Sequence, residues 1–353
     1  MPRRYKPVDD CRYEIQDYID ELDAGTDDDD DDLRQTGSTR RYKQDLRWYD
    51  HWLDDHGIDS VLDVTPADAS RVGRALSNEF NGTTPRYRWD RINAFHDYLV
   101  NMELAESNPL ARWNGSKDSK WGMTKTTQQE RELEDGERYA TSQEDIRKME
   151  KNVGRNRVRD QLVIRMMWQT ALRRGEQSLL TTDMLDREAR EIELPGSITK
   201  NGKRRVVAYQ PSLDGLLKEW LDYSHRDEML GGNDHDYLFV GERGARLHAE
   251  RINEIIIDAA DRAGINRYLY ADANAAMDED GNPIPNRWLI SAHNVRHGYG
   301  TYMIHEAPEE GEEARLWEVS KQMGHSSVKI TEERYVEDDP RAGVGYAHSH
   351  GPD

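Results

Sequence analysis

Thr170-Ala-Leu-Arg-Arg-Gly-Glu176 is the first of three short stretches that decide how this chain is interpreted. The other two are His293-Asn-Val-Arg-His297 and Gly324-His-Ser-Ser-Val-Lys-Ile-Thr-Glu-Glu-Arg-Tyr335. An arginine can hold a phosphate through two parallel hydrogen bonds, a histidine can carry a proton, and a tyrosine can attack phosphorus. Together the three stretches indicate phosphoryl transfer through a phosphotyrosine, without metal or nucleotide.

In order and composition these stretches resemble the conserved boxes of the tyrosine recombinases, the phage integrase and Xer-type family. The resemblance covers about residues 37 to 338, and Ala171 stands where the family usually has glycine. It implies a mainly α fold with a small antiparallel β-sheet, built from an N-terminal helical core-binding (SAM-like) domain and a tyrosine recombinase catalytic domain. It also implies six catalytic residues and two that give structural support: Arg173, Lys200, His293, Arg296, His325 and Tyr335, with Glu176 and His297.

The resemblance assigns a role to each of these residues. Arg173 and Arg296, supported by His325, stabilise the charge on the pentacoordinate phosphate. Tyr335 attacks phosphorus while His293 takes its proton, and Lys200 protonates the 5′ oxygen. The implied function is a site-specific recombinase that forms a 3′-phosphotyrosyl intermediate without cofactor. Its partners are duplex DNA, a tetramer of this chain on two synapsed sites, and accessory DNA-bending proteins.

One departure from the family pattern concerns the nucleophile. Tyr335 follows His325 with one residue more than is usual, and Arg334 occupies the usual position. Arginine stays protonated and presents only donors, so it cannot attack phosphorus. Tyr335 is therefore the predicted nucleophile, and Tyr346 in the glycine-rich tail is the alternative.

The stretch from Glu191 to Tyr209 reads as two short strands around Asn201-Gly202, a strong hairpin signal. The resemblance places the catalytic lysine of the family on this hairpin at Lys200, with Lys203 as its rival. We also expect Lys203 and Arg204 to contact DNA. The alternative is a hairpin that contacts phosphates and has no catalytic member.

Upstream, apolar residues at spacings of three and four predict a helix from Ser38 to His56, and two more begin at Thr65-Pro66 and near Pro85. This helical unit resembles the core-binding domain that clamps the duplex in the family. Basic residues between its aromatic residues are the predicted phosphate contacts: Arg40, Arg41, Lys43, Arg86, Arg88 and Arg91. Alternatively, they form an ordinary solvated face.

These patterns divide the chain into five parts. We expect a disordered acidic leader (1–36), the helical DNA clamp (37–115), a polar linker (116–140), the catalytic domain (141–338) and a tail (339–353). The leader contains the aspartate run Asp27 to Asp32, for which the alternative is an acidic segment that mimics DNA. Within the catalytic part, Thr141 to Glu144 resembles a capping box, and Tyr237 to Val240 reads as a short strand.

The composition restricts the setting in which the protein works. The net charge is −20 over 353 residues, and this acidity favours a halophilic, haloarchaeal-like source whose salt screens the carboxylates. A single cysteine, Cys11, excludes internal disulfides. The absence of a long apolar run and of a secretory signal predicts a cytoplasmic protein with no membrane partner.

The sequence leaves two other functions as alternatives, and it offers one weak candidate for a metal site. The chain could be a non-cleaving DNA-binding accessory protein of the same fold, or a DNA-relaxing enzyme like the type IB topoisomerases. His293 and His297 are four residues apart and could bind a metal on a helix, but no third ligand motif accompanies them, so no metal site is predicted.

Overall fold

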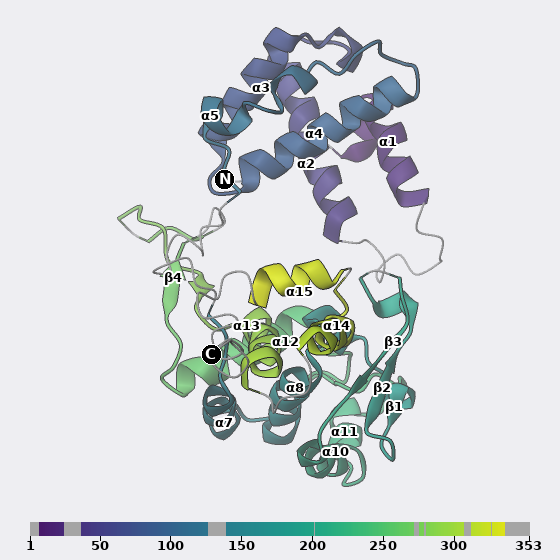
Figure 1. The fold of residues 1–353 in the computed structure, drawn as a ribbon, viewed down its shortest axis with the longest axis vertical. Helices are drawn as coiled ribbons and strands as arrows, with labels where there is room; N and C mark the ends of the chain where they lie inside the picture. Colours follow the sequence, from purple (N-terminus) through teal and green to yellow (C-terminus); the bar gives the residue numbers. More distant parts are fainter. Residues whose placement is uncertain are drawn as a thin grey trace, which may run out of the picture. The chain divides into compact units, whose positions relative to one another are not determined.

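The computed structural model describes residues 7–24, 37–125, 139–200, 202–271, 275–278, 280–306, 312–325 and 327–335. Contacts divide the chain into two units, which are described separately (Figure 1). The first unit comprises residues 1–137 and 271–283, and the second comprises residues 138–270 and 284–353. Among the described residues, no helix combines the length and the apolar character needed to cross a membrane.

The described part of residues 7–125 in the first unit is helical, and residues 275–283 contribute an isolated β-bridge between Met277 and Pro283. Its α-helices are α1 (Tyr13–Ala24), α2 (Gly37–Asp55), α3 (Pro66–Glu79), α4 (Thr84–Asn101) and α5 (Lys117–Trp121), with 3-10 turns at Val8–Asp10, Val61–Asp63 and Ala111–Trp113. Helix α3 begins where the sequence predicts, because Thr65 and Asp68 form a capping box ahead of Pro66. Helix α2 ends just before Gly57, which has a φ of +66°.

Both ends of the predicted clamp need correction. Residues 13–24 were assigned to a disordered leader, but Ile15 and Ile19 of α1 are buried in the core of the first unit. Arg12 ties the start of this helix to Asp50 of α2 through a 2.8 Å hydrogen bond. Helix α5 lies in the predicted linker, yet Trp121 packs directly over Gly73 of α3. Apolar residues in these short segments outweigh their polar surroundings. The aspartate run lies outside the described residues.

The second unit contains helices and two small antiparallel sheets, so the predicted mainly α fold is confirmed. Its helices are α7 (Gln143–Lys151), α8 (Arg157–Thr170), α9 (Arg174–Ser178), α10 (Asp214–Leu221), α11 (His225–Leu230), α12 (Ala249–Arg262), α13 (Ala292–Thr301), α14 (Glu312–Met323) and α15 (Val328–Tyr335), with a π-helical turn at Tyr302–Glu306. Its strands are β1 (Leu185–Asp186), β2 (Glu191–Leu194), β3 (Arg205–Ala208), β4 (Tyr268–Tyr270) and β5 (Arg287–Trp288).

Helix α8 forms the centre of the second unit and packs against α7, α10 and α13. Its residues Leu162, Val163 and Met166 are fully buried. The sheet β1-β2-β3 alternates regularly: Ile192 and Leu194 face the core, whereas Glu191 and Glu193 face solvent. The sheet therefore has one face toward the helices, and residues from that face can enter the site described below.

Two local predictions in the second unit were wrong. The capping box of α7 uses Ser142 and Asp145, one residue later than the predicted pair, because Ser142 donates to and accepts from Asp145. Tyr237 to Val240 does not form a strand: Tyr237 and Val240 each make only an isolated bridge. The predicted hairpin is confirmed as β2 and β3, but a ten-residue loop (195–204) joins the strands instead of a two-residue turn.

Candidate active site

The first arginine box lies at the junction between α8 and α9. Ala171 is the C-cap of helix α8, and its φ of +50° lies in the left-handed region that glycine adopts more readily. This geometry explains why the family pattern has glycine here. The chain then turns so that Arg173 caps α9, with its backbone N–H donating to Glu176 Oε2 at 2.8 Å. The guanidinium of Arg173 also donates to Glu176 Oε1, at 2.8 Å.

Glu176 is the buried centre of this site, with 2% of its side chain exposed. Arg205, the first residue of β3, approaches it from the sheet and donates through both terminal nitrogens, at 3.0 and 2.8 Å. Burial alone would raise the pKa of the Glu176 carboxyl. The hydrogen bonds and charges of Arg205 and Arg173 outweigh burial, so the pKa of Glu176 lies below its ordinary value. The carboxylate therefore stays ionised between two arginines.

The second arginine box joins the other two boxes. Arg296 lies on α13 and is buried, and it donates to the carbonyl oxygens of Ala171 and Met323. Arg173 donates to the next carbonyl along, that of Gly324, at 2.9 Å. Both arginines thus meet at the adjacent carbonyls of Met323 and Gly324. We call Arg173, Glu176, Arg205, Arg296 and the turn Met323–His325 the box cluster.

The turn that carries His325 is a helix C-cap. Gly324 has a φ of +62°, its N–H donates to Lys321 O, and the N–H of His325 donates to Ser320 O, each at 3.0 Å. This pattern is the Schellman motif that ends α14. The imidazole of His325 is bonded through Nδ1 to the hydroxyl of Thr331 on α15, at 2.8 Å. When that hydroxyl donates, Nε2 carries the proton and is the ring atom able to donate to a phosphate.

The two histidines of the second box differ in exposure. His293 lies on the first turn of α13 and is exposed, three residues before Arg296 on neighbouring positions of the helix surface. His297 is buried, and its Nδ1 lies 3.4 Å from Thr301 Oγ1. This burial fits the predicted structural role of His297. In the part of the chain that the structure describes, no group of three or more potential ligands could hold a metal ion.

The basic residues of the hairpin lie in its exposed loop. Lys200 belongs to a turn in which Gly202 N donates to Thr199 O at 3.1 Å, and Lys203 is also exposed. Arg204 is paired with Glu193 across the hairpin at 2.6 Å. Within the described part of the chain, no contact joins Lys200 to the box cluster. The structure does place the base of the hairpin against that cluster through Arg205.

Helix α15 supplies the position of the predicted nucleophile. Thr331, which contacts His325, is fully buried, and Tyr335 is the last residue of the helix, four residues further on. At 3.6 residues per turn, position 335 lies about 40° around the axis from Thr331, and position 334 lies about 60° away on the other side. The additional residue therefore keeps Tyr335 on the helix face of Thr331. Tyr346 lies outside the described residues.

The predicted phosphate contacts of the first unit differ in how exposed they are. Arg40 and Arg41 are exposed on α2, and Lys43 is half-buried. The prediction is wrong for Arg88, which is buried, pairs with Asp45 at 3.0 Å and stacks on Phe80 at 3.9 Å. Arg88 precedes the buried Ile92 and Phe95 by four and seven residues, so α4 turns all three side chains to the same buried face.

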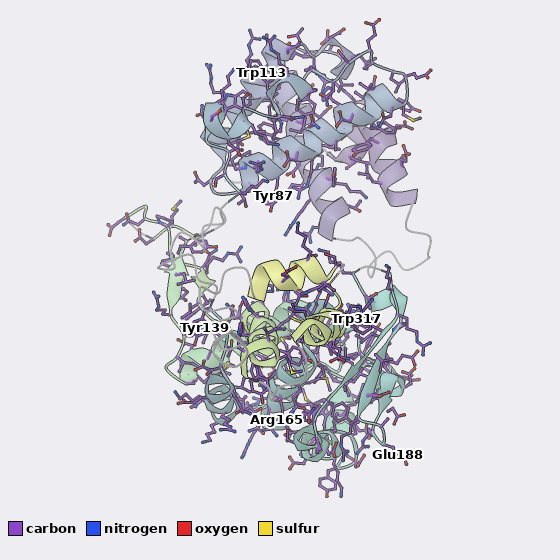
Figure 2. The ribbon with its side chains drawn as sticks, in the orientation of Figure 1. Tyr87, Trp113, Tyr139, Arg165, Glu188 and Trp317 are labelled. Carbon is purple, nitrogen blue, oxygen red and sulfur yellow. The ribbon has the colours of Figure 1, made fainter. Side chains whose placement is uncertain are left out.

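Two further arginines of α4 are committed to carboxylates. Arg86 pairs with Asp118, and Arg91 pairs with Asp45. A phosphate would have to compete with these partners. Exposed aromatic residues remain on the surfaces of both units, among them Tyr87 on α4 and Trp317 on α14 (Figure 2).

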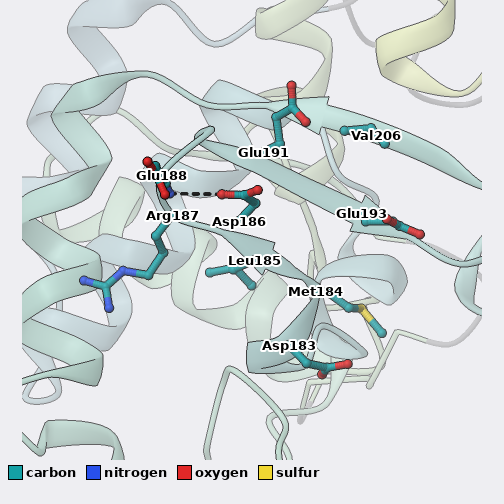
Figure 3. Close-up of a pocket in the computed structure, with 9 residues that line it drawn as sticks. All are labelled: Asp183, Met184, Leu185, Asp186, Arg187, Glu188, Glu191, Glu193 and Val206. Carbon is teal, nitrogen blue, oxygen red and sulfur yellow. Dashed lines mark hydrogen bonds between the residues drawn. The ribbon is translucent and has the colours of Figure 1, made fainter.

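A pocket of about 520 Å³ lies on the solvent face of the sheet, away from the box cluster (Figure 3). It is lined by Asp183, Met184, Leu185, Asp186, Arg187, Glu188, Glu191, Glu193 and Val206. Successive strand residues point to opposite faces, so Val206 faces this pocket while Arg205 faces the helices. Carboxylates dominate the lining, and it is therefore unsuited to binding a phosphate backbone.

Sequence reasoning missed two residues of this region. Arg205 stood in a run of basic residues from Lys203 onward, and its place as the first inward-facing residue of β3 was the signal that distinguished it. Thr331 lies between His325 and Tyr335 and is the only threonine or serine in α15. Arg205 lies outside the three boxes, whereas Thr331 lies inside the third box but was assigned no role.

Comparison with known proteins supports the resemblance. A model of the phage integrase family matches residues 140–341. The tyrosine recombinase XerC of Chromohalobacter salexigens is 24% identical over 301 residues, which are 82% of this chain and 82% of that protein. A probable integrase/recombinase of Methanocaldococcus jannaschii is 25% identical over 191 residues, covering 53% of this chain and 48% of its own length.

Solved structures share the fold. The Tn1549 transposon integrase in complex with transposon right end DNA has a TM-score of 0.64 at 13% identity, over 96% of this chain and 99% of that one. The XerH site-specific recombinase bound to its difH substrate has a TM-score of 0.59 at 14% identity, over 99% and 98% of the two chains. None of these matches favours the accessory protein or the topoisomerase-like enzyme.

Proposed function

The chain belongs to the phage integrase family as a site-specific tyrosine recombinase that acts on DNA, and we propose that the box cluster is its active site. One observation carries this assignment. Arg173 and Arg296, from boxes far apart in the sequence, both donate to adjacent carbonyls of the turn before His325. Two guanidinium groups and an imidazole therefore gather where a phosphate could replace the carbonyls as acceptor.

In the proposed reaction, Arg173 and Arg296 bind the non-bridging oxygens of the scissile phosphate, and His325 Nε2 donates to the same group. The hydroxyl of Tyr335 attacks phosphorus and passes its proton to His293. The bond from phosphorus to the 5′ oxygen breaks, and Lys200 protonates that oxygen. The products are a 3′-phosphotyrosyl bond and a 5′ hydroxyl, and attack by a partner 5′ hydroxyl reverses the steps. The bond energy is retained, so neither ATP nor a metal is required.

The scheme requires the Lys200 ammonium group to reach the 5′ oxygen and the Tyr335 hydroxyl to reach phosphorus. The exposed loop of the hairpin supports such a role for Lys200, because its position is not fixed by a described contact with another box. Lys203 could take the same role from the same loop. Glu176 and His297 are proposed as supporting residues that do not contact DNA, which accords with their burial.

The two units have separate proposed tasks. The first unit clamps the duplex, with Arg40, Arg41 and Lys43 of α2 as phosphate contacts. The second unit holds the scissile phosphate, and its residues Lys203 and Arg204 also contact the DNA. Active assemblies are tetramers on two synapsed sites, and accessory DNA-bending proteins assist them. We propose that residues 339–353 bridge neighbouring copies and that the protein works in a cytoplasm of high salt.

A nicked duplex tests the proposal directly. The recombination site can be located from direct repeats that flank the gene, and a nick beside the cleavage point releases a short fragment and traps the covalent adduct. Wild-type protein should form the adduct in EDTA, and Tyr335→Phe should bind the duplex but form none. An adduct that persists in Tyr335→Phe and disappears in Tyr346→Phe would move the nucleophile to the tail. Adduct formation that requires added magnesium would contradict the scheme.

A further inference from the structure

Arg205 belongs to the box cluster but has no role in the reaction as proposed so far, although it lies against both Glu176 and Gly324. Its guanidinium makes two parallel hydrogen bonds with Glu176. It also lies so close to Gly324 that a Cβ there would be 2.3 Å from Nη1. Only 11% of its side chain is exposed. One side chain thus touches the first box and the turn of the third box.

The charges of the box cluster indicate what Arg205 does. Glu176 is nearly fully buried and ionised, and Arg173 donates to it. Without Arg205, the carboxylate would cancel the charge of Arg173, and a phosphate would meet a neutral pair. With Arg205, the three groups carry one net positive charge, and 28% of the Arg173 side chain remains exposed. We propose that Arg205 is a positioning residue that neutralises Glu176, so that the positive charge of Arg173 acts on the scissile phosphate.

The same contact fixes the hairpin. Arg205 pairs with Leu194 at the base of the loop that carries Lys200. Its hydrogen bonds with Glu176 therefore set the distance between that loop and Arg173. Lysine at position 205 would keep the charge but lose the planar pair of donors that holds both oxygens of the carboxylate.

A neutral phosphate distinguishes this role from a merely structural one. Replacing a non-bridging oxygen of the scissile phosphate with a methyl group removes the charge that Arg173 has to offset. The inference rests on the proposed role of Arg173, so Arg173→Ala is the reference. Arg187→Met is the matched control, because Arg187 makes an equivalent two-point pair with Asp222 at 2.7 and 2.8 Å on an exposed surface.

The experiment measures single-turnover adduct formation on the nicked duplex, with either the ordinary phosphate or the methylphosphonate. On the ordinary phosphate, Arg205→Met should be roughly 10- to 100-fold slower than wild type, the range expected when one charged hydrogen-bonded pair is lost. On the methylphosphonate, its deficit should shrink to about 5-fold or less, as should that of Arg173→Ala. Arg187→Met should match wild type on both substrates.

Three results would count against the inference. Arg205→Met as fast as wild type on the ordinary phosphate would remove the role altogether. An equal deficit on both substrates, with Arg173→Ala rescued, would show that Arg205 only supports the fold. Absence of any wild-type adduct would instead refute the proposed function itself. If Arg205→Met does not fold, Arg205→Lys tests the inference in its place. Its adduct formation should be less than about 10-fold slower than wild type on the ordinary phosphate, and this difference should disappear on the methylphosphonate.

Discussion

Replacing Gly324 with alanine tests the contact between the third box and Arg205. Gly324 has a φ of +62°, and a Cβ at this position would lie 2.3 Å from Arg205 Nη1 and 3.0 Å from its Cζ. An ordinary contact would require the guanidinium to retreat by about 1 Å. The guanidinium cannot retreat so far and keep its hydrogen bonds of 3.0 and 2.8 Å with Glu176.

The cost has two parts that can be separated. A left-handed alanine costs about 1 to 2 kcal/mol wherever it occurs. Losing or stretching the charged hydrogen bonds of Arg205 adds about 2 to 4 kcal/mol. Gly264 is the matched control, since it lies in the same unit, has a φ of +69° and would place its Cβ in open space. Gly264→Ala should therefore show the first cost alone.

Scanning calorimetry of both variants measures the difference. We expect the free energy of unfolding of the second unit to fall about 2 to 4 kcal/mol further in Gly324→Ala than in Gly264→Ala. Adduct formation should slow only in Gly324→Ala. Equal losses of stability in the two variants would refute the reasoning, because they would show that Arg205 yields to the new methyl group at no cost.

Four other predictions follow from the site and the core. Arg173→Lys and Arg296→Lys should each reduce adduct formation at least about 100-fold despite their retained charge, and near-normal rates would exclude both from the site. Thr331→Val should slow adduct formation about 10-fold through the loss of its bond to His325, whereas Thr331→Ser should restore it; equal rates in the two variants would contradict this role. Burial lowers the pKa of His96, whose ring is hydrogen-bonded to Tyr49, to about 3. As the pH falls below about 6.5, this histidine therefore takes up a proton in the unfolded chain but not in the folded one. The free energy of unfolding of the first unit should fall by about 2 kcal/mol between pH 7 and pH 5. His96→Gln should remove that slope in pH-dependent unfolding, and an unchanged slope would assign it elsewhere. DNA binding, followed by anisotropy across a KCl series, should persist at about 1 M if the acidic surface reflects a halophilic cytoplasm, and affinity that vanishes there would argue against such a source.

The sequence alone predicted those parts of the fold that depend on local patterns. Apolar periodicity located α2 and α4, and the Thr65-Pro66 cap located α3. The boxes predicted Arg173, Arg296 and His325 as site residues, and the structure brings the two arginines to the turn that precedes His325. The neighbourhood of Glu176 could not be predicted in this way, since Arg205 reaches it only after β3 folds beside α9.

Other errors also arose from tertiary packing. Its place among aromatic residues made Arg88 look like a phosphate contact, but the partners that bury it, Asp45 and Phe80, lie on or after other helices. Helix α1 seemed too polar for a core element until its few apolar residues met α2 and α4. Charge composition describes a segment as a whole, whereas burial is decided residue by residue.

The geometry of α15 bears on how relatives of this chain are recognised. A search pattern that fixes the interval between the box histidine and the tyrosine would reject this sequence. Because a helix returns to the same side after either three or four residues, either interval would keep the proposed nucleophile on the side of α15 that carries Thr331. A search pattern for such enzymes should therefore allow both intervals.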